Sequence, residues 1–93
     1  MKLEWQNSNF GRYKKTLLVL IDDYDEERAI AIIVDDGLNN FDCYYTLYFE
    51  ETKRIFCSFA SLEEAKRAAI QYVKSEAIER MKELTYIINF IER

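Results

Sequence analysis

Apolar residues in the first two-thirds of the chain fall into four short runs, with polar, turn-like clusters between them. The runs span 13–21, 28–35, 41–49 and 54–59, and they are rich in the β-branched and aromatic residues that favour strands. Asp36-Gly37 is typical of a hairpin turn, because Gly accepts the positive φ that such turns need. The short links predict a four-stranded antiparallel meander, with residues 3–6 as a candidate extra strand at its edge.

The periodicity changes at Ser61, where Ser61-Leu62-Glu63-Glu64 has the form of a capping box. From there apolar residues recur every three or four positions, as they do on one face of a helix: Leu62, Ala65, Ala69, Val73, Ala77, Met81, Leu84, Ile88 and Ile91. A helix over 61–93 would be about 45 Å long, against about 20 Å for a six-residue strand. It must overhang the sheet or break. The β-prone composition of 85–91 favours a break near Thr85.

The sequence therefore predicts an α+β fold (ββββα) in a single domain, 1–93, with one long C-terminal helix packed on one face of the meander. We expect Ile21 to pair with Arg28, Asp35 with Phe41, and Glu50 with Lys53. Alternate residues of a strand point to opposite faces. The face assigned to the helix then carries Leu18, Leu20, Ala29, Ala31, Ile33, Phe41, Cys43, Tyr45, Leu47, Phe49 and Phe56.

The opposite face is also apolar, whereas a sheet face open to water should alternate apolar with polar residues. The residues expected to form a dimer or partner surface there are Leu17, Val19, Ile30, Ile32, Tyr44, Tyr48, Ile55 and Phe59. One helix cannot cover both faces. Three alternatives for what covers this second face stay open: the segment 5–10 folded across the sheet, the back half of a broken C-terminal helix, or a second chain. The simplest second chain is another copy in a two-fold dimer.

Composition excludes several kinds of chemistry. The chain has no His, two Gly and two Cys, so it holds no His-dependent catalytic dyad or triad, no phosphate-cradling glycine loop and no four-ligand zinc site. Its apolar runs are shorter than the roughly 20 residues that span a bilayer, and its start has no signal-peptide pattern. We expect a cytoplasmic, non-enzymatic protein that needs no cofactor or metal and does not associate with a membrane.

Charge is unevenly placed along the chain. Of its 17 acidic residues, ten lie within 22–51, against the single base Arg28. In a meander the first and third turns meet at one end of the sheet, which gathers an acidic cluster: Asp22, Asp23, Asp25, Glu26, Glu27, Glu50 and Glu51. Three interpretations of this cluster stay open. It is a pair of solvated turns that oppose aggregation of the sheet, a surface that docks on a basic protein, or a cation site. The cluster lacks the residue spacing of a calcium loop.

The aromatic residues allow a second class of function. Tyr44, Tyr48 and Phe59 resemble a stacking platform for single-stranded nucleic acid. The bases available beside that platform are few: Lys14, Lys15, Lys53 and Arg54. Core or interface packing is the favoured interpretation of the aromatic residues, and nucleic-acid binding is the alternative.

A resemblance adds a family-level expectation. The layout Trp5…Gly11-x-Tyr13, Tyr44-x-x-x-Tyr48 and Phe59-x-Ser61-Leu62-Glu63-Glu64-Ala65-Lys66 is similar to small phage and prophage proteins built from a β-meander and one helix. Acidic members of that group without catalytic residues resemble anti-defence proteins of the anti-CRISPR kind, which imply blocking of a partner's surface. The order of strands and helix is also similar to Whirly-type single-stranded-DNA-binding folds, but here the strands and turns are acidic.

The leading hypothesis is a protein–protein interaction module that inhibits a host or defence protein, through its acidic turns and a dimeric sheet. A homodimer and a protein partner with a basic surface follow from that hypothesis. Single-stranded nucleic-acid binding is the alternative.

Overall fold

The computed structural model describes residues 1–9, 11–38, 40–45, 53–54 and 58–93. Five antiparallel strands form one sheet in the order β1-β2-β3-β4-β5, and a single helix follows them. The elements are β1 (Lys2–Ser8), β2 (Lys14–Ile21), β3 (Glu27–Asp35), β4 (Phe41–Tyr45), β5 (Lys53–Arg54) and α1 (Leu62–Ile91). The predicted α+β meander with one C-terminal helix is confirmed, and the candidate extra strand is the seven-residue β1.

The pairing of the strands agrees with the expected register in part. Asp35 pairs with Phe41 as predicted, and Gly37 takes a φ of +78° in the turn between β3 and β4. The register between β2 and β3 shifts by one residue between Leu18 and Val19, so Ile21 pairs with Glu27 and not with Arg28. An extra residue in one strand of an antiparallel pair interrupts the alternation of side chains there.

The predicted register of the last hairpin is wrong. Tyr45 pairs with Lys53 and Tyr44 with Arg54, so the chain turns over a longer link than the two residues expected between Glu50 and Lys53. Residues 46–52 and 55–57 lie outside the described part of the chain. The prediction failed because no Gly or Asn marks a tight turn in that stretch, and without one the register has no local anchor.

The core lies between α1 and the helix-facing side of β2, β3 and β4. Ala65 and Ala69 of α1 are fully buried, and they let the helix approach Ile33 and Cys43 closely. Trp5 of β1 packs against the same core from the sheet edge, with the Lys66 ammonium 5.2 Å from the centre of its ring. The prediction that Leu18, Ala31, Ile33, Phe41, Cys43 and Tyr45 face the helix is confirmed.

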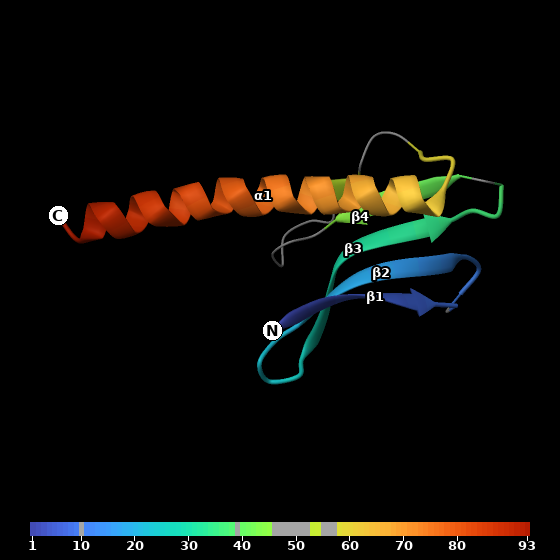
Figure 1. Cartoon of the computed structure of the whole chain (residues 1–93), viewed down its shortest axis with the longest axis horizontal. Coiled ribbons are helices and arrows are strands. Elements are labelled where there is room, and N and C mark those ends of the chain that lie inside the picture. The colour runs from blue at the N-terminus through green and yellow to red at the C-terminus, as the bar shows by residue number, and fades with distance from the viewer. Residues whose placement is uncertain (10, 39, 46–52, 55–57) are drawn as a thin grey trace.

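The predicted break of the helix near Thr85 is wrong, because α1 runs unbroken from Leu62 to Ile91. Figure 1 shows α1 lying along one side of the sheet and then continuing well beyond it to the C-terminus. The overhang follows from length: α1 has 30 residues and rises about 45 Å, more than the strands beneath it can span.

Candidate functional site

The projecting end of α1 carries a dense group of exposed apolar side chains. We call residues 81–91 the arm; every one of its side chains is exposed. Its seven large apolar residues have exposed fractions between 49% and 73%: Met81, Leu84, Tyr86, Ile87, Ile88, Phe90 and Ile91. A helix in contact with water alone should be apolar on one stripe at most, so a surface of this kind marks an interaction site.

The local sequence does not explain by itself why the arm is helical. Ser61 caps the other end of α1, where its hydroxyl accepts a hydrogen bond from the Glu64 amide at 3.2 Å. Within and beside the arm, Glu79–Lys82 and Arg80–Glu83 form ion pairs at 3.3 and 3.7 Å, which contribute little on a surface. Residues 85–91 are rich in β-branched and aromatic types, which are mediocre helix formers. Helices are stabilised mainly by packing of an apolar face, and every side chain of the arm is exposed.

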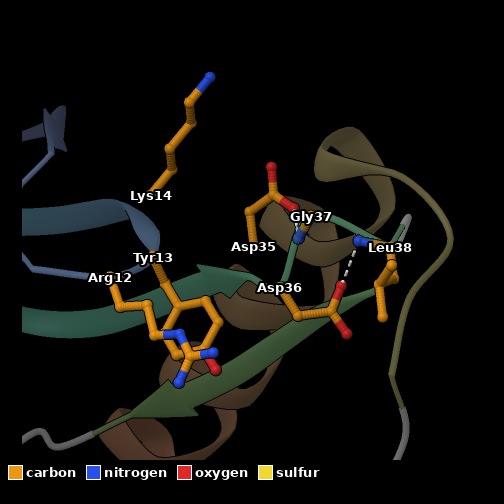
Figure 2. A pocket seen from close by; sticks show the side chains of 7 residues that line it. All are labelled: Arg12, Tyr13, Lys14, Asp35, Asp36, Gly37 and Leu38. Carbon is orange, nitrogen blue, oxygen red and sulfur yellow. Dashed lines mark hydrogen bonds between the residues drawn. The ribbon is translucent and has the colours of Figure 1, made fainter.

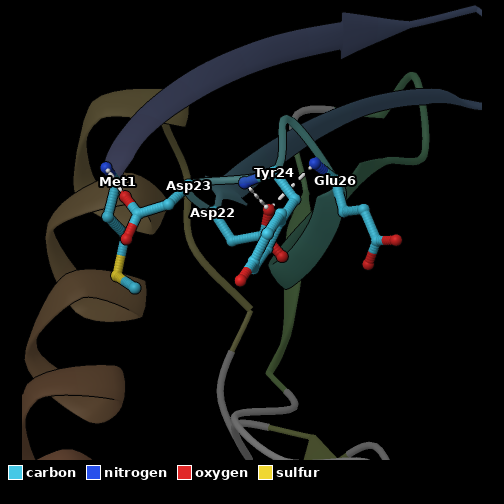
Figure 3. A network of polar contacts seen from close by, with 5 residues as sticks. All are labelled: Met1, Asp22, Asp23, Tyr24 and Glu26. Carbon is cyan, nitrogen blue, oxygen red and sulfur yellow. Dashed lines mark hydrogen bonds and ion pairs between the residues drawn. The ribbon is translucent and has the colours of Figure 1, made fainter.

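The acidic turn between β2 and β3 is organised by its own hydrogen bonds. One carboxylate oxygen of Asp22 accepts from the amides of Tyr24 at 2.8 Å and Glu26 at 3.0 Å. Asp23 binds the N-terminal ammonium of Met1 at 2.7 Å, as Figure 3 shows. Two of the predicted acidic site residues therefore have structural partners, while Asp25 and Glu26 remain exposed at the tip of the turn.

Other members of the predicted acidic surface are less informative. Glu27 accepts a hydrogen bond from the Gln6 amide at 3.2 Å, and Glu50 and Glu51 lie outside the described residues. Among the residues that the structure describes, no group of three or more His, Cys, Asp or Glu side chains is arranged to hold a metal ion.

The opposite end of the sheet carries a second group of carboxylates beside two bases. Arg12, Tyr13 and Lys14 line an open pocket of about 540 Å³ with Asp35 and Asp36 (Figure 2). Asp36 accepts from the Leu38 amide at 2.8 Å, and this bond holds the pKa of the Asp36 carboxyl below its usual range. The Asp36 carboxylate therefore stabilises the hairpin turn, and the pocket beside it follows from the shape of that turn.

The predicted partner face of the sheet is not a continuous exposed patch. Ile30 lies beside the register shift and packs with Leu18 and Ala31 against Ala69 of α1, so its assignment to the opposite face is wrong. Phe59 bridges to Phe41 and packs on the helix side as well, and that assignment is also wrong. Cross-strand partners share a face, so the altered pairing after β4 carries Phe59 with Phe41.

The remaining residues of that face are buried to different degrees. Val19 is only 3% exposed, and Leu17, Ile32 and Tyr44 are half-buried. Tyr48 and Ile55 lie outside the described residues. The segment expected to fold across this face does not do so over the part that is described, because Trp5 belongs to β1 and packs on the helix side.

Over the residues that the structure describes, the groups considered for nucleic-acid binding are brought together only in part. Lys14 lies in one cross-strand row with Phe59, through Asp35 and Phe41, but the Phe59 ring packs against the core. Lys53 and Arg54 form β5 beside Tyr45 and Tyr44, and Tyr48 lies outside the described residues. The thiol of Cys43 is buried and donates to the Ala65 carbonyl at 3.4 Å, which is a packing role.

Two further findings bear on the class of protein. In the described part of the chain, no helix combines the length and the apolar character needed to cross a bilayer. The sequence matches no protein-family model, and neither a curated protein nor a solved structure shows significant similarity to it.

Sequence reasoning recognised that the helix would be too long for the sheet but did not identify the arm as a site. Two signals were present: the length mismatch, and the dense apolar residues from Tyr86 to Ile91, where only Asn89 is polar. The β-propensity of these residues favours a break in the helix, and the expectation of a break hides the exposed apolar surface that a continuous helix would carry.

Proposed function

We propose that this protein is a non-enzymatic protein-binding module whose principal contact surface is the arm of α1. The observation that carries the proposal is the exposure of seven large apolar side chains in one helical segment of which every side chain is exposed. Amphipathic helices commonly act by laying apolar residues against another protein's surface. The established parts of the fold would then serve to hold this helix in a fixed direction.

The acidic turn supplies a second, electrostatic contribution to this proposal. Asp25 and Glu26 are exposed at its tip. Complementary charge mainly raises the association rate and the specificity of a complex. A partner with a basic surface fits this turn, and Glu26→Lys should slow association with such a partner while leaving the fold unchanged.

Inhibition of a host or defence protein stays part of the proposal as its most specific form. Its support is the resemblance to small phage proteins, and blocking of a partner's surface is the mechanism that resemblance implies. An exposed apolar helix beside an acidic turn is compatible with blocking and requires no catalytic residues.

The proposal can be tested by photo-crosslinking from the arm in the cell that makes the protein. A benzophenone amino acid at Phe90, which is 62% exposed, should give covalent adducts of discrete mass with protein. The matched control places the same group at Gln71, an exposed polar position of α1 that lies over the sheet rather than beyond it. If position 90 gives no more protein adducts than position 71, the arm is not a protein-binding surface.

A further inference from the structure

The apolar stripe of α1 does not stop where the sheet stops. Residues 18 apart in a helix lie about five turns apart and point in the same direction. Ile87 and Ile91 therefore point as Ala69 and Val73 do, and those two pack against the sheet. Beyond the sheet the same side of the helix faces open space, with Ile87 49% and Ile91 73% exposed.

The arm also carries the spacing of a helix-pairing seam. Met81, Leu84, Ile88 and Ile91 follow one another at intervals of three, four and three residues, the a and d positions of a heptad. None of these four positions is charged, and all four side chains are more than half exposed. Such a seam is stable when a second apolar helix interdigitates with it.

We propose that a second copy of this chain covers the arm, as an antiparallel pair of arms related by a two-fold axis. The inference rests on the proposed function and names the partner of that same surface. In an antiparallel pair an a position faces a d position of the partner, so Met81 would pack on the partner's Ile91 and Leu84 on the partner's Ile88. The two-fold axis repeats both layers, which gives four apolar layers from one surface.

Charge fixes the direction and the register of this pair. A parallel pair would extend the seam toward the sheet and bring Lys74, one heptad before Met81, against the same lysine of the partner. An antiparallel pair slid by one heptad would put Lys74 over the partner's Ile91, a charged side chain against an apolar layer. The register with Leu84 opposite Ile88 avoids both of these contacts of Lys74 and sets the two sheets at opposite ends of the dimer.

The outer side of the arm argues against a lipid surface as the occupant. Helices that lie on anionic membranes carry mainly Lys and Arg on their polar face. The polar residues of the arm are Lys82, Glu83, Thr85 and Asn89, which have no net charge. The four layers of the seam span only about 16 Å of helix, so the contact is small for a specific interface and the dimer should be reversible.

Sedimentation of the full chain tests the proposal directly. The wild-type protein should pass from monomer to dimer between about 1 and about 500 µM, the range of a modest association constant. Ile88→Glu places a charge in the central layers and should weaken dimerisation at least about tenfold. Tyr86→Glu is the matched control, because Tyr86 is 68% exposed and lies outside the seam, and it should dimerise like the wild type.

Far-ultraviolet circular dichroism should show that both variants stay folded, since neither side chain touches the sheet. A wild-type chain that remains monomeric across the whole range overturns the inference, and so does one that instead partitions onto lipid vesicles. An Ile88→Glu chain that dimerises as well as the wild type also overturns it, because the contact would then lie elsewhere.

Disulfide trapping tests the antiparallel arrangement. The two-fold axis passes beside Thr85, so Thr85→Cys should form a symmetric interchain disulfide on mild oxidation. Lys82→Cys, on the outer side of the arm, should form far less, and the wild-type chain treated alike controls for the two native cysteines. Equal disulfide formation by Lys82→Cys and Thr85→Cys overturns the proposed antiparallel pairing of the arms.

The inference and the proposed function fail in different ways. If the benzophenone at Phe90 captures only other proteins and sedimentation finds only monomer, the arm binds protein but not itself, and the inference alone is wrong. If neither experiment detects a protein contact, both are wrong.

Discussion

The two halves of α1 share one sequence pattern and have opposite environments. In the first half, Ala65 and Ala69 are fully buried against the sheet, and Tyr45 of β4 reaches across to Glu76 at 3.4 Å. In the second half, beyond Arg80, every side chain is exposed. Two small residues, Ala65 and Ala69, lie where the helix is closest to the sheet, whereas the large apolar residues of the arm are exposed.

This contrast separates two roles that apolar residues take in a helix. Alanines permit close approach and dense packing, which stabilises the fold of one chain. Leu, Ile, Met and Phe offer a large area that becomes stabilising only when another surface covers it. The first half of α1 therefore stabilises the monomer, and we propose that the second half serves a contact outside it. The following changes should affect the two halves unequally.

Ile33→Ala should have the largest effect on stability. Ile33 is 1% exposed and packs against Ala65, so its truncation leaves a cavity under the first half of α1. The free energy of unfolding should fall by about 2–5 kcal/mol. Urea denaturation followed by circular dichroism measures it, and a loss below that of an exposed surface substitution would show that the core does not lie here.

Ala69→Leu should destabilise the protein by about 1–3 kcal/mol, because no space exists for a larger side chain at a fully buried position. Ala77→Leu, two turns further along α1 at an exposed position, is the matched control and should change the stability by less than about 0.5 kcal/mol. Thermal unfolding of the pair gives the comparison. Equal losses for the two variants would contradict the close packing of Ala69 against the sheet.

Ser61→Ala should cost about 1 kcal/mol, since it removes the side chain that caps the first turn of α1. The effect should appear as reduced protection of the amides around Glu64 in hydrogen exchange, with little change in the arm. Protection lost equally along the whole helix would mean that the two halves unfold together.

Leu84→Gln should have the smallest effect on the monomer. Leu84 is 52% exposed, and Gln is a comparable helix former, so the change should stay within about 0.5 kcal/mol at low protein concentration. At high protein concentration the loss of unfolding free energy relative to the wild type should grow, because the proposed dimer stabilises the folded wild-type chain by mass action. A large loss in dilute solution would show that the arm contributes to the monomer's own core.

Particular residues show where sequence reasoning succeeded and where it stopped. Asp36-Gly37 anchored the pairing of β3 with β4, and Ser61 marked the start of α1, because turn and cap chemistry is local. The shifted pairing beside Ile30 and the bridge of Phe59 to Phe41 were not predicted, because strand register depends on contacts between distant segments. Thr85 was wrongly expected to break the helix because propensity was weighed above continuity.

The sequence by itself determined the order of strands and helix, the cap, the tight turn and the apolar spacing of α1, since each follows from neighbouring residues and the two periods of regular structure. Only the tertiary structure decided which part of that apolar stripe is covered. The stripe packs against the sheet at Ala65, Ala69 and Val73, whereas every side chain of residues 81–91 is exposed, so the same pattern is core in one part of the helix and exposed surface in the other. Periodicity records which side chains share a face, whereas burial depends on what lies opposite that face.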